Sequence, residues 1–170
     1  MQEIAPTPER MRKGDIRKNR GKITAHSEPL YKRMNIPEDA QHSLGYFDIL
    51  RLCFLQRHDG IKSRWLNERV DYEFRDETVL TLADKYERII RIMHNTTAYP
   101  MNRAHTAALK GVLEFEIPIA DANGNRKLIQ YIRKYTRSKE FRGNDAKAIL
   151  LEAIAAFEDA VKKLSIDKKQ

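Results

Sequence analysis

Apolar residues recur at the spacing of an α-helix along most of this chain. The clearest stripe lies between residues 79 and 93, and its members are Val79, Leu82, Tyr86, Ile89, Ile90 and Met93. Because three or four residues separate most successive members, they share one face of a helix, and that face is buried against a core. With Asp76 as its cap, this segment predicts an amphipathic helix that ends at Asn95.

The same spacing predicts further helices on both sides of this one. They are expected at 37–58, at 103–113 with Asn102 as the cap, at 126–137 and at 146–164, with a short helix or turn at 61–70. The chain of 170 residues has only seven Gly and six Pro, which disfavours loop-rich or many-stranded architectures. We therefore predict an all-α fold, a compact bundle of five or six helices.

One segment departs from the helical pattern. Residues 113–119 read LEFEIPI, in which apolar and polar side chains alternate as they do along a short strand. Asp121 to Asn125 then reads as a turn. Either one short β-hairpin near 113–120 or an extended link after the preceding helix fits this pattern.

The two ends of the chain differ in character. Residues 1–29 carry a net charge of +3 and have few apolar side chains, at no consistent period. Such a segment buries too little apolar surface to compensate for the conformational entropy that it would lose on folding by itself. We expect a flexible basic arm at 1–29, which either orders on a partner or serves as a solubilising leader, and a single helical domain at 30–166.

The sequence offers no motif for catalysis, metal binding or membrane insertion. Cys53 is the only cysteine and lies in an apolar run, which indicates a buried, inert thiol. No two of the five histidines have metal-site spacing, and glycine-rich nucleotide loops are absent. We expect no enzyme activity, no cofactor and no metal. Without a signal peptide or a long apolar stretch, we also expect no membrane contact and a cytoplasmic location.

Positive charge is concentrated near the C-terminal end. The segment 126–142 carries +6 of the total net charge of +8; its single acid is Glu140 and its cations are Arg126, Lys127, Arg133, Lys134, Arg137, Lys139 and Arg142. On a helix, Arg126, Arg133 and Arg137 share one side. Because cations on phosphates release counterions, this pattern predicts binding to nucleic acid, preferably duplex DNA. A solvated helix face is the alternative interpretation.

The order of helices in this region fits a helix-turn-helix unit at 103–164. In such a unit the last helix enters the major groove and Gly143 belongs to the turn. Asn144 and Lys147, at the start of that helix, would then contact base edges while the seven cations hold the DNA backbone.

Two stretches also resemble a group of known proteins. Residues 5–16 read APTPERMRKGDI, and 148–157 read AILLEAIAAF. The first resembles the "ATPER…KGD" leader of small, uncharacterised proteins of alphaproteobacteria and their prophages, and the second resembles the last helix of their degenerate helix-turn-helix. The resemblance covers about a third of the chain and implies a DNA-binding protein with no catalytic residue.

These observations lead to two hypotheses of function. The first is a DNA-binding protein, a phage-type or bacterial transcriptional regulator or a DNA-handling factor. The second is a structural or adaptor protein of a phage or cellular assembly, which acts through helix-mediated contacts with itself or another protein and whose basic face meets acidic protein.

Overall fold

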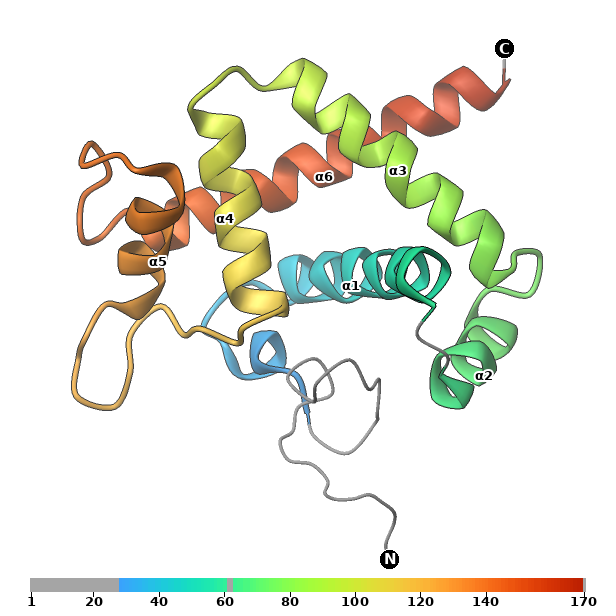
Figure 1. The fold of residues 1–170 in the computed structure, drawn as a ribbon, viewed down its shortest axis with the longest axis horizontal. Coiled ribbons are helices and arrows are strands. Elements are labelled where there is room, and N and C mark those ends of the chain that lie inside the picture. Colours follow the sequence, from blue (N-terminus) through green and yellow to red (C-terminus); the bar gives the residue numbers. More distant parts are fainter. Residues whose placement is uncertain (1–27, 61–62, 170) are drawn as a thin grey trace, which may run out of the picture.

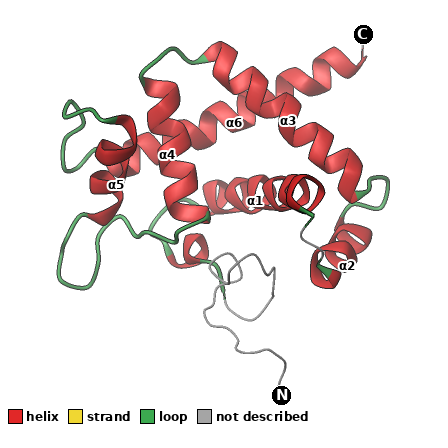
Figure 2. Cartoon of the chain, in the orientation of Figure 1, coloured by secondary structure: helices red, strands yellow, loops and turns green. Residues whose placement is uncertain are grey.

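The computed structural model describes residues 28–60 and 63–169, and it shows an all-α architecture. A short 3-10 helix, η3 (Leu30–Arg33), precedes six α-helices (Figure 2). These are α1 (Glu38–Asp59), α2 (Arg64–Glu73), α3 (Val79–Thr96), α4 (Met101–Leu113), α5 (Lys127–Thr136) and α6 (Ala146–Lys169). The predicted fold class is confirmed, whereas the predicted arm falls almost entirely on residues 1–27, outside the described residues.

The helices pack around one apolar core. Helix α1 packs on α3, α4 packs on α5, and the long helix α6 contacts α1, α3, α4 and α5 (Figure 1). The most buried large side chains come from all six helices, with Leu150 as the contribution of α6. Helix α5 and the loops on either side of it form one end of the molecule, at the left of Figure 1.

The helix positions follow the predicted periodicity, but two caps differ. Helix α3 begins after Thr78, whose side chain accepts a hydrogen bond from the N–H of Thr81 in a capping box, so the predicted cap Asp76 is wrong. Helix α4 begins at Met101 after Pro100, so Asn102 lies inside the first turn. In both cases the hydrophobic stripe places the helix correctly, and the cap is shifted by two residues.

No strand forms among the described residues, so the hairpin near 113–120 is wrong. The alternating segment follows α4 as a loop whose backbone bonds return to the helices. Phe115 N–H donates to the carbonyl of Lys110, Ile117 N–H to that of Gly111, and Leu128 N–H to that of Pro118. These contacts occupy backbone groups that a neighbouring strand would need.

Cys53 lies in this core as predicted. Its side chain is fully buried, and burial raises the pKa of the thiol to about 12. Within the described part of the chain, no helix combines the length and apolar character that a membrane crossing requires.

Candidate nucleic-acid interface

Helix α5 is strongly amphipathic and is held by one face. Leu128, Ile129 and Ile132 are buried, whereas Lys127, Gln130 and Lys134 are exposed. Lys127 and Lys134 are seven residues apart, about two helical turns, so they lie on the same exposed side. The hydrophobic stripe that attaches α5 to α4 and α6 therefore turns two lysines outward.

The two loops beside α5 add further cations at the same end of the molecule. Of the seven cations predicted to contact nucleic acid, six are exposed, and we refer to them as the cationic surface: Arg126, Lys127, Lys134, Arg137, Lys139 and Arg142. Arg126 precedes α5, and the last three follow it in the loop 137–145 (Figure 1). The structure thus brings these six residues to one end, from one helix and its flanks.

The cationic surface stands out because its cations lie close together without acidic partners. Elsewhere, several arginines and lysines are paired with acids, in the pairs Arg51–Asp48, Arg57–Asp84, Arg57–Glu87, Arg64–Glu68, Arg69–Glu73, Lys85–Glu77 and Lys110–Glu114. Other exposed cations, such as Arg88, Arg91 and Lys162, have no ion pair among the described residues but are spread over α3 and α6. Among the described residues, no member of the cationic surface has an acidic group within ion-pair distance. Its charge is therefore available to an external anion.

The seventh predicted cation has a contact inside the protein. Arg133 is half-buried, and its Nε donates a hydrogen bond of 2.6 Å to the carbonyl oxygen of Phe141. The ring of Phe141 is itself buried in the core. Arg133 thus fastens the loop 137–145 against α5, so its first role is to position the loop.

Two more contacts give this loop its shape. The side chain of Arg126 lies beside Gly143, where a Cβ would come within 3.4 Å of its Nη1. Asp145 accepts a hydrogen bond from the backbone N–H of Arg142. The loop is therefore folded back along α5, and Arg142 is held near Arg126.

The predicted base-contacting residues lie at the beginning of α6. Asn144 and Lys147 are both exposed, whereas one face of α6 is buried against the core, including Ile149, Leu150 and Ala153. The connection between α5 and α6 spans nine residues, 137–145. Since a helix-turn-helix motif has a turn of about three to four residues, the structure does not confirm such a unit.

An arginine from α4 joins this end of the molecule, and the sequence pattern missed it. Arg103 is exposed, its Nη2 donates to the carbonyl of Tyr135 at 3.1 Å, and its guanidinium lies 4.9 Å from the centre of the Tyr135 ring. No spacing rule connects residues 32 positions apart, so only the packing of α4 on α5 reveals this neighbour.

Neither a protein-family model, nor a curated protein, nor a solved structure matches this chain. The likeness to small alphaproteobacterial and prophage proteins therefore stays a prediction. The case for a function rests on the residues and the geometry described above.

Proposed function

We propose that this protein binds duplex DNA through the cationic surface and acts without catalysing a reaction. The observation that carries the proposal is charge balance. Six exposed cations gather at one end of the molecule without acidic partners among the described residues, while the other helices pair many of theirs. Leaving like charges together costs free energy. Binding of DNA offsets that cost, because the cations neutralise phosphates and release the counterions condensed on the DNA.

The aromatic residues of α5 support a duplex rather than a single strand. Proteins that bind single strands offer free aromatic faces on which bases stack. Here Tyr131 and Tyr135 are half-buried, Tyr131 packs against the Phe115 ring at 5.7 Å between centroids, and Tyr135 is covered by Arg103. Of these three rings only Phe115 is exposed, so the end offers six exposed cations but no series of free rings on which successive bases could stack.

Recognition of sequence would come from the start of α6. Asn144 and Lys147 are exposed next to Arg142, so they would meet base edges when the cationic surface holds the backbone. Such a protein would serve as a phage-type or bacterial transcriptional regulator or as a DNA-handling factor. Binding of an acidic protein within an assembly is the competing hypothesis, and the test below separates the two.

The test is the salt dependence of binding to a short DNA duplex, measured by fluorescence anisotropy between about 50 and about 200 mM salt. The informative variant is Lys127→Gln with Lys134→Gln, because both lysines are exposed and neither side chain makes a hydrogen bond or an ion pair within the described part of the chain. Lys127 has only a longer-range electrostatic effect on Asp121. If both contact phosphates, the slope of log K against log salt should become shallower by about 2.

The matched control is Lys162→Gln with Lys163→Gln, which removes the same charge from exposed positions of α6. These lysines lie toward the opposite end of the molecule (Figure 1). The control should keep the wild-type slope. Equal losses in both variants would point to net charge alone, and absence of binding at the lowest salt would overturn the proposal in favour of a protein partner.

A further inference from the structure

A cavity of about 210 Å³ lies between helices α1, α3, α4 and α5, away from the cationic surface. An apolar cavity of about 150 Å³ is large enough to hold benzene. This one therefore has room for a molecule of about two fused rings. Its rim contains half-buried or exposed residues, such as Ile90, His94 and Thr97, through which a ligand can enter.

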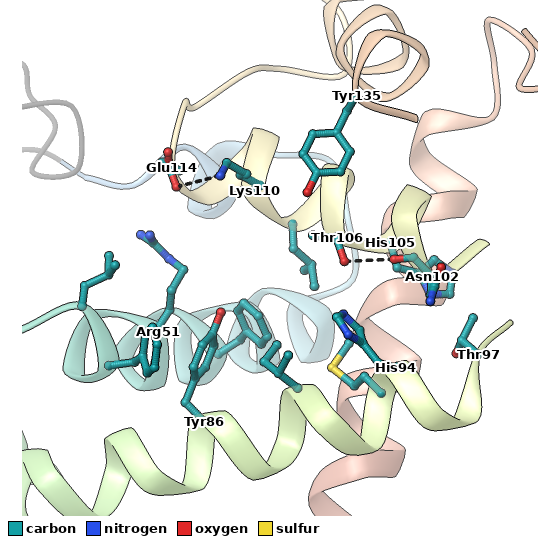
Figure 3. Close-up of a pocket in the computed structure, with 16 residues that line it drawn as sticks. Arg51, Tyr86, His94, Thr97, Asn102, His105, Thr106, Lys110, Glu114 and Tyr135 are labelled. Atoms are coloured by element: carbon teal, nitrogen blue, oxygen red, sulfur yellow. Dashed lines mark hydrogen bonds and ion pairs between the residues drawn. The ribbon is translucent and has the colours of Figure 1, made fainter. Parts of the chain in front are cut away.

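The walls are aromatic and aliphatic. Phe47 and Phe54 come from α1, Tyr86 from α3 and Tyr135 from α5, and Tyr86 and Tyr135 lie on opposite sides of the space (Figure 3). Aromatic walls favour a flat ligand ring, which packs edge-on or offset against them. The cavity is thus suited to a planar aromatic molecule.

The charged groups at one end of the cavity are already balanced. Arg51 is paired with Asp48 at 3.0 Å, and Lys110 lies 3.9 Å from Glu114. A ligand with a net charge would find no unpaired opposite charge at this end, since Arg51 is paired with Asp48 and Lys110 with Glu114. The ligand is therefore expected to be uncharged.

The opposite end presents an unsatisfied acceptor. Asn102 lines the cavity next to Thr97 and Thr106, and its side-chain Oδ1 is buried without a hydrogen-bond partner (Figure 3). Buried polar atoms are almost always paired in folded proteins, so an unpaired one at a cavity wall indicates a missing partner. That partner must donate an N–H or O–H group.

We infer that this cavity binds a small, uncharged aromatic molecule of one or two rings that donates a hydrogen bond to Asn102. The rings of Phe47, Phe54, Tyr86 and Tyr135 hold its flat body. Asn102 sets its orientation. None of the six residues of the cationic surface lines the cavity, although Tyr135 of α5 does, so ligand binding here is a property separate from the proposed DNA contacts and is tested without DNA.

The test compares indole with benzofuran, which has the same shape but no N–H, in titrations of the full chain followed by backbone amide NMR. Indole should give saturable shifts at residues around the cavity, and it should bind about fivefold more tightly than benzofuran. In Asn102→Ala this preference should disappear. No DNA is present in either titration, so the result does not depend on the proposed function.

A cavity-filling variant supplies the control. In Thr106→Phe the added ring occupies the cavity, and the lost hydroxyl bonded only to the Asn102 carbonyl of its own helix. Indole affinity should fall at least about tenfold, while the amide spectrum remains that of a folded protein. If this variant does not fold, Ile90→Phe fills the cavity from α3 instead. Unsaturable shifts, unchanged binding in the filled variants, or equal affinity for both probes would overturn the inference.

Discussion

Arg133 and Lys134 are neighbours in the sequence and play different parts in the structure. Arg133 donates to the Phe141 carbonyl and holds a loop, whereas the side chain of Lys134 is exposed. A charge count weights the two equally. At the scale of residues, an exposed cation without an internal contact is the one to test for DNA binding, which is why the variant above changes Lys127 and Lys134 and spares Arg133.

Arg137 combines a charge with an unfavourable backbone conformation. It ends α5 with φ at +57°, in the left-handed region that glycine adopts at little cost. We expect Arg137→Gly to raise the free energy of unfolding by about 0.5 to 1 kcal/mol, since relief of the strain exceeds the added chain entropy. Chemical denaturation with unchanged m-value would measure this gain.

Arg137→Ala is the control for that change. It removes the same charge but keeps a Cβ in the left-handed conformation, so it should not be stabilised. If Arg137 contacts a phosphate as proposed, both variants should lose the same affinity for DNA, because both remove that contact. A stability gain in the alanine variant would show that charge repulsion, and not backbone conformation, is the source.

His105 makes the stability of the protein depend on pH. It is buried in α4, and burial lowers the pKa of its imidazole below 6.5 although Glu152 lies 3.6 Å away and opposes the shift. The folded state therefore takes up a proton less readily than the unfolded state. Its contribution to stability is complete above a pH of about 6.5 and is lost as the pH falls below that value.

The wild-type melting temperature should consequently fall between about pH 7.5 and about pH 5, and the fall should be smaller in His105→Gln. Thermal unfolding followed by circular dichroism at a series of pH values gives both curves. Parallel curves for the two proteins would mean that other groups cause the pH dependence.

At the scale of elements, the contact between α4 and α5 is the one that places the cationic surface. Gly111 permits this close approach: a Cβ there would come within 2.9 Å of Leu128 Cδ1 and 3.1 Å of Tyr131 Cδ2. Gly111→Ala should therefore destabilise the protein by about 1 to 3 kcal/mol through overpacking, despite the better helix propensity of alanine.

Gly45→Ala in α1 offers a comparison for that change. The nearest atom to its Cβ is the hydroxyl oxygen of Tyr31 at 3.0 Å, the tip of a side chain that can shift. We expect a smaller loss, measured by urea unfolding of both variants. If Gly111→Ala proves the more stable of the two, α5 is not held as closely as the structure shows.

The elements also show what a sequence pattern can and cannot predict. Stripes of apolar residues located the helices to within a few residues, because burial of one face determines both the stripe and the helix. The two predicted caps, Asp76 and Asn102, are each two positions away from the observed ones, since good capping residues occur at neighbouring positions. The alternation at 113–119 left a hairpin and an extended link open, and it could not show that the backbone bonds of this segment go to α4 and α5 rather than to a strand.

The candidate sites also differ in whether the sequence alone could reveal them. The cationic surface was visible in the sequence because its residues are close together between 126 and 142. The sequence could not reveal the contact of Arg103 with Tyr135 or the cavity, because the residues involved lie on different helices and meet only after folding. The helix-turn-helix remains a prediction, and the nine-residue connection 137–145 gives it no support.

At the scale of the whole molecule, the balance of charge differs between two parts of the protein. Helices α1 to α4 balance much of their charge internally, while α5 and the loop 137–145 leave theirs unpaired among the described residues. An anion that approaches from solution is therefore attracted to one end of the molecule. On the proposed function, this polarity predicts the end of the molecule at which DNA would bind.

The most direct test is an amide NMR titration of the protein with a short DNA duplex at low salt. The shifts should be concentrated at residues 126–147 and at Arg103, should be reversed when salt is raised, and should be small around Lys162 and Lys163. Shifts that cover α1 to α3, or shifts that persist at high salt, would contradict binding through the cationic surface.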